Sequence, residues 1–285
     1  MTASRWKNWI GPVRRTTDTL SPEAAKRWLA TFDLPDSAGA MPQGIHFCLC
    51  LPDTATARLG PDGHPEREGE HTSFLPPIPL GRRMWAGSRI TFDAPLRLGA
   101  AIARTSRIVS ITEKVGGSGH LVFVDILHEI LADGEPAVRE VQTVVYRAMA
   151  APDAPLSPET PEGGAFDHAG WEEHRVVVPD PRLLFRYSAL TFNTHRIHYD
   201  APYAREVERY RGLVVHGPLT ASLLLQLAAE RLGDNALREF SFRGLSPAIA
   251  GEPLHLVMRE EADRITLAAF ADDGRQVVQA SAQGR

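Results

Sequence analysis

The residues best suited to acid/base chemistry lie in one short polar stretch. Asn193, His195, His198, Tyr199 and Asp200 fall within eight residues. Histidine titrates near neutral pH and is the most frequent general acid or base in enzymes. We therefore predict that His198 is a general base and that Asn193, five residues earlier, orients a water through its carbonyl oxygen. His195 is expected to brace the loop, and Asp200 to cap the helix that follows.

A second candidate group stands at the start of an apolar helix. Residues 217–232 are mostly Leu and Ala, with Pro218 near the first turn and Gly233 past the end, which predicts a helix buried on nearly all sides. His216 and Gly217 precede its first turn, where unpaired N–H groups and the helix dipole favour negative charge. Aimed at a thioester carbonyl, the Gly217 N–H would stabilise an enolate. The alternative is that Gly217 serves only a tight helix entry.

Arg82, Arg83 and Trp85 are candidates for binding an anionic ligand. They follow residues 61–81, a Pro-rich segment predicted to be an extended surface loop, because proline fits neither a helix interior nor a central strand. Arginine recognises carboxylates and phosphates through paired hydrogen bonds. The alternative is a solvated charge pair at the junction between loop and strand.

Composition narrows the class of protein. The chain of 285 residues has 43% hydrophobic and 23% charged residues and a net charge of −4, which is typical of a globular protein and gives no electrostatic footprint for nucleic acid. The two cysteines, Cys48 and Cys50, are expected to be buried thiols, and no metal site or membrane span is expected. The N-terminus lacks a secretory leader pattern, so a cytoplasmic location is expected.

The elements that position these residues fall into two similar halves. Ser21 is predicted to cap a helix over residues 22–32, and four β-rich runs follow between residues 89 and 149, with turns at 116–119 and 133–134. Residues 151–165 form the predicted linker. The second half repeats the pattern, with a strand at 172–180, a turn that starts at Asp180-Pro181, the apolar helix, and antiparallel strands to the C-terminus. We therefore predict an α+β double hot-dog fold, in which two antiparallel sheets are each wrapped around a central helix.

The polar stretch also carries a resemblance to a known family. The run YSALTFNTHRIHYDAPYA (187–204), followed by GLVVHGPLTASLL (212–224), resembles the hydratase motif of MaoC-like enoyl-CoA hydratases and hydroxyacyl-thioester dehydratases. FLPPIPLGRRMWAGSRITF (74–92) resembles the degenerate first domain of the mesaconyl-CoA and itaconyl-CoA hydratase branch. The resemblance implies a degenerate hot-dog domain at 1–150 that accommodates the acyl group, and a catalytic hot-dog domain at 166–285.

The resemblance also implies an activity and a site. It assigns the base to His198 and the oxyanion donor to Gly217, while Asn193 stands where the wider family has an aspartate, so that His198 is left as the sole base. The implied reaction is the hydration of an enoyl-CoA, such as mesaconyl-C4-CoA or itaconyl-CoA, to citramalyl-CoA. No cofactor is implied, and a homodimer is expected. Substrate contacts are expected from Arg82, Arg83, Trp85, Tyr199 and His216, with the arginines facing a free carboxylate.

Two other functions remain open on the sequence. The first is a 3-hydroxyacyl-thioester dehydratase of fatty-acid synthesis, which predicts an apolar tunnel in the first half. The second is a non-catalytic acyl-CoA binding protein that has lost its acid. A thioesterase is disfavoured, because those enzymes usually place a carboxylate on the active-site helix and the segment HGPLTAS (216–222) has none.

Overall fold

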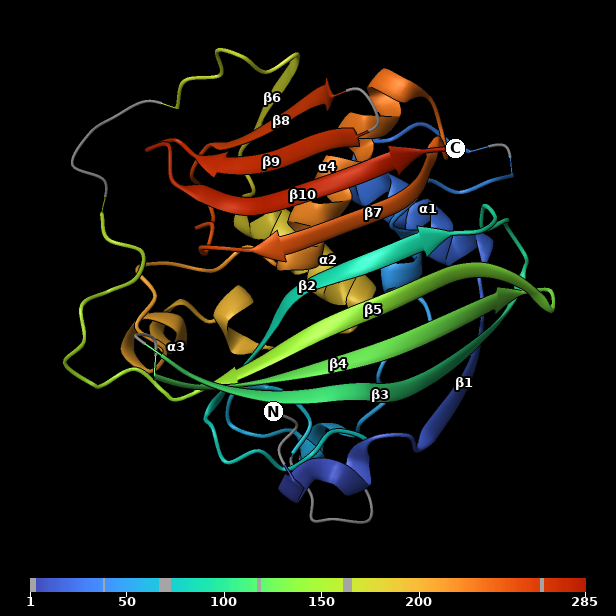
Figure 1. The fold of residues 1–285 in the computed structure, drawn as a ribbon. Helices are drawn as coiled ribbons and strands as arrows, with labels where there is room; N and C mark the ends of the chain where they lie inside the picture. The colour runs from blue at the N-terminus through green and yellow to red at the C-terminus, as the bar shows by residue number, and fades with distance from the viewer. Residues whose placement is uncertain (1–3, 38, 67–72, 117–118, 161–165, 262–263) are drawn as a thin grey trace.

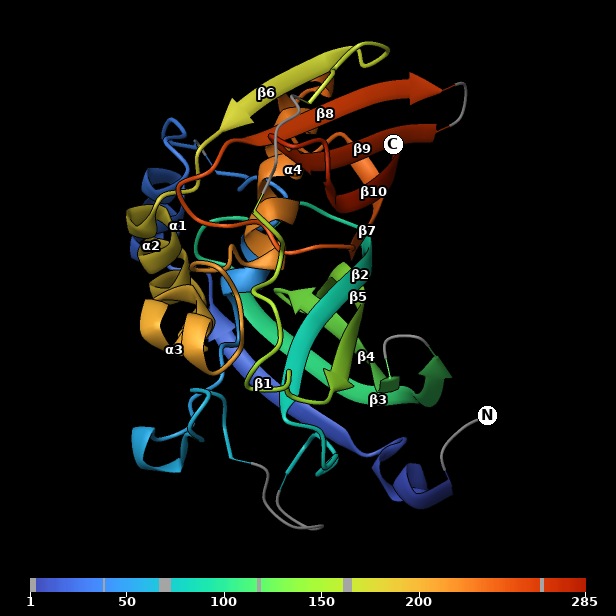
Figure 2. The same cartoon turned by 90° about the vertical axis from the view of Figure 1, so that its left-hand side faces the viewer.

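The strands of both halves form one continuous sheet. The structure is a computed structural model that describes residues 4–37, 39–66, 73–116, 119–160, 166–261 and 264–285. Within this part of the chain, ten strands are ordered β1-β3-β4-β5-β2-β7-β10-β9-β8-β6, and every neighbouring pair is antiparallel. The helices α1, α2 and α4 lie together on one side of this sheet (Figures 1 and 2).

The first half supplies the strands at one end of the sheet. Ser21 accepts a hydrogen bond from the Ala24 N–H and caps α1, as predicted. Asp133 and Gly134 both have positive φ and make the predicted turn between β4 and β5, whereas the centre of the predicted 116–119 turn lies outside the described residues. The elements of this half are η1 (Ser4–Trp9), β1 (Val13–Thr19), α1 (Pro22–Thr31), η2 (Ile45–Cys48), η3 (Thr56–Arg58), β2 (Arg82–Phe92), β3 (Ala101–Gly116), β4 (Gly119–Ala132) and β5 (Glu135–Arg147).

The second half supplies the other end of the sheet and the long helix. The predicted linker falls between β5 and β6, and its last residues, 161–165, lie outside the described part of the chain. The division into a 1–150 and a 166–285 domain stays a prediction. The elements of this half are β6 (Glu173–Val177), α2 (Pro181–Thr191), η4 (Arg196–His198), α3 (Ala201–Glu206), α4 (Gly217–Leu232), β7 (Leu237–Gly244), β8 (Leu254–Glu261), β9 (Arg264–Ala271) and β10 (Gln276–Gly284).

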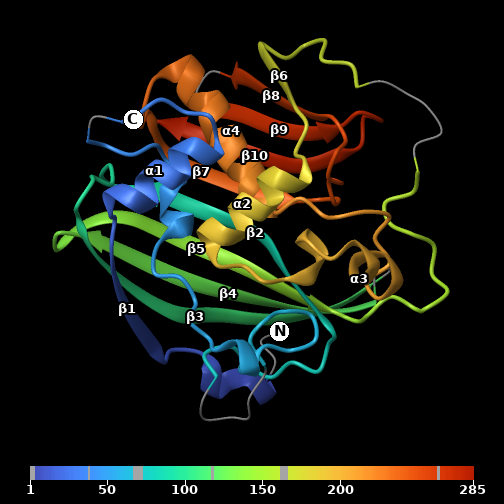
Figure 3. The same ribbon diagram turned by 180° about the vertical axis from the view of Figure 1, so that it is seen from behind.

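Helix α4 is buried along most of its length. Every residue from Pro218 to Ala228 is buried, because the curved sheet packs around the helix through β2, β8, β9 and β10. Figure 3 shows α4 in front of the strands of the second half, with α1 and α2 beside it. The apolar residues of α4 point in nearly all directions because its surroundings are apolar on all sides.

The two halves meet where β2 pairs with β7. Gly87 faces Arg243 in this pairing, and a Cβ at Gly87 would lie 2.2 Å from the carbonyl oxygen of Phe242, so only glycine fits there. The strand β2 is irregular between Trp85 and Gly87. The main chain of Trp85 is thereby brought next to the first residue of α4, where a Cβ on Gly217 would lie 3.7 Å from the Trp85 carbonyl oxygen.

Two segments differ from the expectations for them. The chain after Asp180 was expected to turn, but it forms α2, because the Asp180 side chain accepts from the Leu183 N–H and Pro181 occupies the first helical position. The end of the Pro-rich segment is not a surface loop. Its apolar residues pack against the sheet with Trp6 and Trp9, and Ile78 is fully buried. Prolines keep this segment extended and leave its apolar side chains free to pack.

Cys48 and Cys50 are buried free thiols, as predicted. Within the described residues, no helix combines the length and the apolarity that crossing a membrane requires.

Candidate active site

A cavity of about 1380 Å³ lies between the two halves and is lined by residues of both. From the second half, Asn193, His195, His198 and Gly217 border it. The first half contributes strands β2 to β5 and the loop that contains His64. The predicted base and the predicted oxyanion donor therefore face the same space.

Helix α2 and a tight turn set the position of the polar loop. The helix ends at Thr191, and its C-cap residue Phe192 has a left-handed φ of 49°. The Asn193 Oδ1 atom then accepts a hydrogen bond of 2.9 Å from the backbone N–H of His195. Asp200 accepts from the Tyr203 N–H at 3.0 Å and caps α3, as predicted. These local bonds direct the segment between them towards the cavity.

His198 is held in one tautomer. Its Nδ1 lies 2.7 Å from the carbonyl oxygen of Val214, and because a carbonyl only accepts, Nδ1 carries the hydrogen. The Nε2 atom is therefore unprotonated and available on the cavity side. Burial, together with His216 and His195, holds the pKa of His198 well below its usual value, although the bond to Val214 opposes the shift. The imidazole is thus neutral at neutral pH and able to accept a proton.

His216 packs against the His198 ring and is almost fully buried. The two rings stack with centroids 3.6 Å apart. The Nε2 of His216 lies 2.9 Å from the Ser188 hydroxyl, and its Nδ1 is buried without a partner among the described residues. Burial is the main cause that lowers the pKa of His216 to about 3. His216 borders the cavity, but in this arrangement it supports His198.

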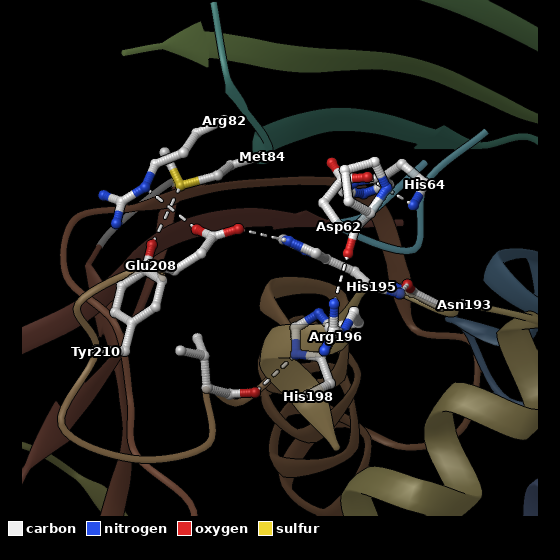
Figure 4. A network of polar contacts seen from close by, with 12 residues as sticks. Asp62, His64, Arg82, Met84, Asn193, His195, Arg196, His198, Glu208 and Tyr210 are labelled. Carbon is white, nitrogen blue, oxygen red and sulfur yellow. Dashed lines mark hydrogen bonds and ion pairs between the residues drawn. The ribbon is translucent and has the colours of Figure 1, made fainter. Parts of the chain in front are cut away.

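His195 belongs to a buried charged network that includes Arg82 (Figure 4). Its Nε2 lies 3.2 Å from Glu208 Oε1, and Arg82 Nε lies 3.2 Å from Glu208 Oε2. The arginine also lies over the Tyr210 ring, 5.2 Å from its centroid. Arg82 and Glu208 are 6% and 2% exposed. Arg82 borders the cavity and also neutralises the buried Glu208, because an unpaired charge at that depth is costly; its contact with a ligand carboxylate stays a prediction.

Two residues of the first half, Asp62 and His64, lie beside this network. His64 Nδ1 is 2.9 Å from Asp62 Oδ2, and the His64 ring lies 4.2 Å from the His195 ring. Burial acts to raise the pKa of Asp62, but the hydrogen bonds and charge of His64 hold it below its usual range. Asp62, His64 and His195 also offer ligand atoms within 4.8 Å of one another, although one ring nitrogen of each histidine is already hydrogen-bonded to a carboxylate, His64 Nδ1 to Asp62 and His195 Nε2 to Glu208.

The remaining predicted ligand contacts divide into two groups. Trp85 and Arg83 border the cavity, and the Trp85 ring is fixed by its Nε1 bond of 2.9 Å to the Ser88 hydroxyl. Tyr199 does not border it. Its side chain is half exposed at the C-terminal end of the 3-10 helix η4, and its contact with a substrate stays a prediction.

The stability of the folded protein is expected to depend on pH through Glu140, which lies in the cavity wall. It is 5% exposed and accepts from Ser88 Oγ at 2.5 Å. Burial raises the pKa of Glu140 from 4.5 to about 7, against the opposing effects of Ser88 and Arg104. The folded state then holds a proton that the unfolded state releases, so stability falls as pH rises between these values and stays low above them.

We expect Glu140→Gln to remove this contribution, which is on the order of 3 kcal/mol across the window. The measurement is the free energy of unfolding at pH 4.5 and pH 7.5 for both proteins. The wild type should lose more stability than the variant over that interval, and equal losses would contradict the prediction.

Comparison with known proteins supports a family assignment. The model for the family hydroxyacyl-thioester dehydratase type 2 matches residues 44–250. The chain is 42% identical to the mesaconyl-C(4)-CoA hydratase of Chloroflexus aurantiacus over 287 aligned residues, which cover 99% of both chains.

Solved structures support the fold. HtdX of Mycobacterium tuberculosis superposes with a TM-score of 0.68 at 17% identity, covering 96% of this chain and all of that one. A second protein of the same organism, described as a double hot-dog, gives a TM-score of 0.53 at 14% identity, with 96% of each chain covered. The predicted double hot-dog fold is confirmed, with the strands of the two halves joined in one sheet where two sheets were predicted.

Proposed function

This chain belongs to the hydroxyacyl-thioester dehydratase type 2 family, and we propose that it is an acyl-CoA hydratase whose substrate is a short branched dicarboxylyl-CoA such as mesaconyl-C4-CoA. The substrate class rests on the full-length similarity to the Chloroflexus hydratase. The observation that carries the reaction type is the geometry of His198. Its Nδ1–H is committed to Val214, and its basic Nε2 is left for the cavity that Gly217 also borders.

These residues can add water across the double bond without a cofactor. His198 Nε2 removes one proton from a water while the water oxygen attacks the β-carbon. The electron pair of the double bond moves onto the thioester oxygen, and the Gly217 N–H stabilises the enolate that results. His198 then returns the proton to the α-carbon, so that it ends neutral. The Asn193 amide can hold the water but cannot accept its proton.

The wall of the cavity favours a short polar acyl group. In the first half this wall includes Arg104, Glu140 and Gln142, with His46 and His128 beside them. A long alkyl chain would have to desolvate these groups without offering them hydrogen bonds, which is unfavourable. Apolar residues such as Ile126, Ile130 and Val144 line the same wall, so it is mixed rather than the uniformly apolar tunnel expected of a fatty-acid dehydratase. This supports the dicarboxylyl substrate over the long-chain alternative.

Arg83 is the arginine that we assign to the free carboxylate of the substrate. It borders the cavity, it lies close enough to contribute to the lowered pKa of His64, and no described acidic residue pairs with it. In mesaconyl-C4-CoA the free carboxylate sits on the β-carbon, beside the point of attack. The Arg83 guanidinium, which lies near His64, is therefore on the side of the cavity where this carboxylate would bind.

We expect Arg83→Met to reduce the preference for mesaconyl-C4-CoA over crotonyl-CoA, measured as the ratio of kcat/KM values, by about tenfold or more, the scale of a charge-assisted hydrogen bond. Arg89→Met is the control, because Arg89 is exposed on the same strand and should leave the ratio unchanged. If the Arg83 variant kept the wild-type ratio, its assignment would be withdrawn.

A substrate panel tests the proposed function. Loss of the enoyl-thioester absorbance is followed with mesaconyl-C4-CoA, itaconyl-CoA, crotonyl-CoA and medium-chain enoyl-CoAs. We expect the highest kcat/KM with a branched dicarboxylyl-CoA. The highest value with medium chains would favour the dehydratase alternative, and tight CoA binding without turnover of any substrate would favour the non-catalytic one.

A further inference from the structure

A segment of the first half is fastened to the polar loop of the second. Arg196 donates its backbone N–H to the Asp62 carbonyl at 3.0 Å and its Nη1 to the Pro61 carbonyl at 2.9 Å. The Thr194 hydroxyl donates to the Gly63 carbonyl at 2.5 Å. Gly63 has a φ of +85°, and a Cβ there would lie 1.8 Å from the Thr194 carbonyl oxygen. Hydrogen bonds from Arg196 and Thr194 to the main-chain carbonyls of residues 61–63 therefore hold this segment in place.

His64 follows residues 61–63 directly and is held in a defined tautomer. Asp62 accepts from the backbone N–H of His64 at 3.0 Å and lies 2.9 Å from its Nδ1. The low pKa of Asp62 keeps its carboxylate ionised, and an ionised carboxylate only accepts. The His64 Nδ1 is consequently protonated, and its Nε2 carries a lone pair. The side chain is 21% exposed although it lies inside the protein, because it borders the cavity.

The other imidazoles near the base are already engaged. His195 directs its Nε2 to Glu208, and His216 is sealed behind His198 with its Nε2 at Ser188. The histidine rings form a row in which His64 contacts His195 and His195 contacts His198, with centroid distances of 4.2 Å and 5.5 Å. The Nε2 of His64 has no partner among the described residues.

A water attacking the substrate has two hydrogens, and the base takes only one. The wider family places an aspartate five residues before the histidine, where this chain has Asn193, whose amide oxygen already accepts from the His195 N–H. A second acceptor beside the water would fix its orientation, so that a lone pair of its oxygen points at the β-carbon. An imidazole nitrogen is suited to this role because it accepts a hydrogen bond while uncharged.

We propose that His64, oriented by Asp62, is a catalytic residue that accepts the second hydrogen bond of the attacking water. This inference rests on the proposed hydration reaction. One proton of the water passes to His198 Nε2 and is returned to the α-carbon. The other stays on the oxygen, hydrogen-bonded to His64 Nε2, and becomes the hydrogen of the β-hydroxyl. The oxygen–carbon bond forms as the double bond is lost, so His64 undergoes no net protonation. The first half thus contributes to the chemistry as well as to the acyl pocket.

The test measures kcat and KM for His64→Ala and Asp62→Asn with the best substrate of the panel. We expect kcat to fall at least tenfold in both variants, with KM within about threefold of the wild type, because water orientation is lost and substrate contacts remain. Asp62→Asn keeps the shape of the loop but allows the proton of His64 to sit on Nε2. Added imidazole should restore part of the activity of His64→Ala, a rescue that an unfolded protein would not show.

The control is His120→Ala. His120 also pairs with a carboxylate, at 3.1 Å from Glu113, but it does not border the cavity, so wild-type kcat is expected. Wild-type kcat in His64→Ala, or a rise in KM with kcat unchanged, would overturn the role of His64. A lack of rescue in a variant with the wild-type melting temperature would do the same. Failure of the wild type to hydrate any enoyl-CoA would instead refute the proposed function on which the inference rests.

Discussion

Replacing His198 with alanine is expected to lower kcat by at least about 10²-fold, the usual scale for loss of a general base. The reason is geometric. His198 borders the same cavity as Gly217, and its Nδ1 lies 2.7 Å from the Val214 carbonyl oxygen, which leaves Nε2 as the basic nitrogen. Steady-state hydration rates at saturating substrate provide the measurement.

Two further variants separate loss of the base from loss of structure. His198→Asn can still donate an N–H to Val214 but has no basic nitrogen, so it is expected to lose as much activity as the alanine variant. His168→Ala removes an exposed histidine of the same half and should retain wild-type turnover. Near-normal turnover in either His198 variant would remove His198 from the mechanism.

Replacing Arg82 with methionine is expected to destabilise the fold by about 3–5 kcal/mol, because Glu208 would remain buried without its counter-charge. Arg82 and Glu208 are 3.2 Å apart and both are almost fully buried. The free energy of unfolding at pH 7 measures the effect.

The double variant Arg82→Met with Glu208→Leu is the matched test. It removes both charges but also leaves the buried His195 Nε2 without its acceptor, so it should recover part of the lost stability. A loss of stability below about 1 kcal/mol in the single variant, or an equal or larger loss in the double variant, would show that this ion pair does not stabilise the fold.

The parts of the site that are local in sequence could be predicted, and the parts that depend on long-range contacts could not. The polar residues from Asn193 to Asp200 and the start of α4 can each be recognised from a few adjacent residues. The structure places Asn193, His198 and Gly217 around one cavity. The roles assigned to these three residues stay predictions. The Asp200 cap was predicted for the same local reason and is confirmed.

Arg82 shows what the sequence could not reveal. Its partner Glu208 is distant in the chain, and nothing near either residue indicates that they meet. The contribution of Asp62 and His64 was missed because they lie in a loop whose contact with Thr194 arises only when the halves fold together. The short run PDGHP (61–65), an acid and a histidine around a glycine, was the available signal.

Helix α2 was missed for a different reason. Asp180 followed by Pro181 is the same kind of helix start as Ser21 followed by Pro22, which correctly predicted α1. The Asp-Pro pair was read as a turn instead, although its cap bond to Leu183 resembles the bond that begins α1.

The most direct test of the central claim is hydration in ¹⁸O-labelled water, with mass analysis of the product formed from mesaconyl-C4-CoA. Addition across the double bond predicts an intact CoA thioester that gains one labelled water, with the label in the β-hydroxyl group, and no such product with His198→Ala. Free CoA together with a dicarboxylic acid labelled in its carboxyl group would indicate thioester hydrolysis and would contradict the account.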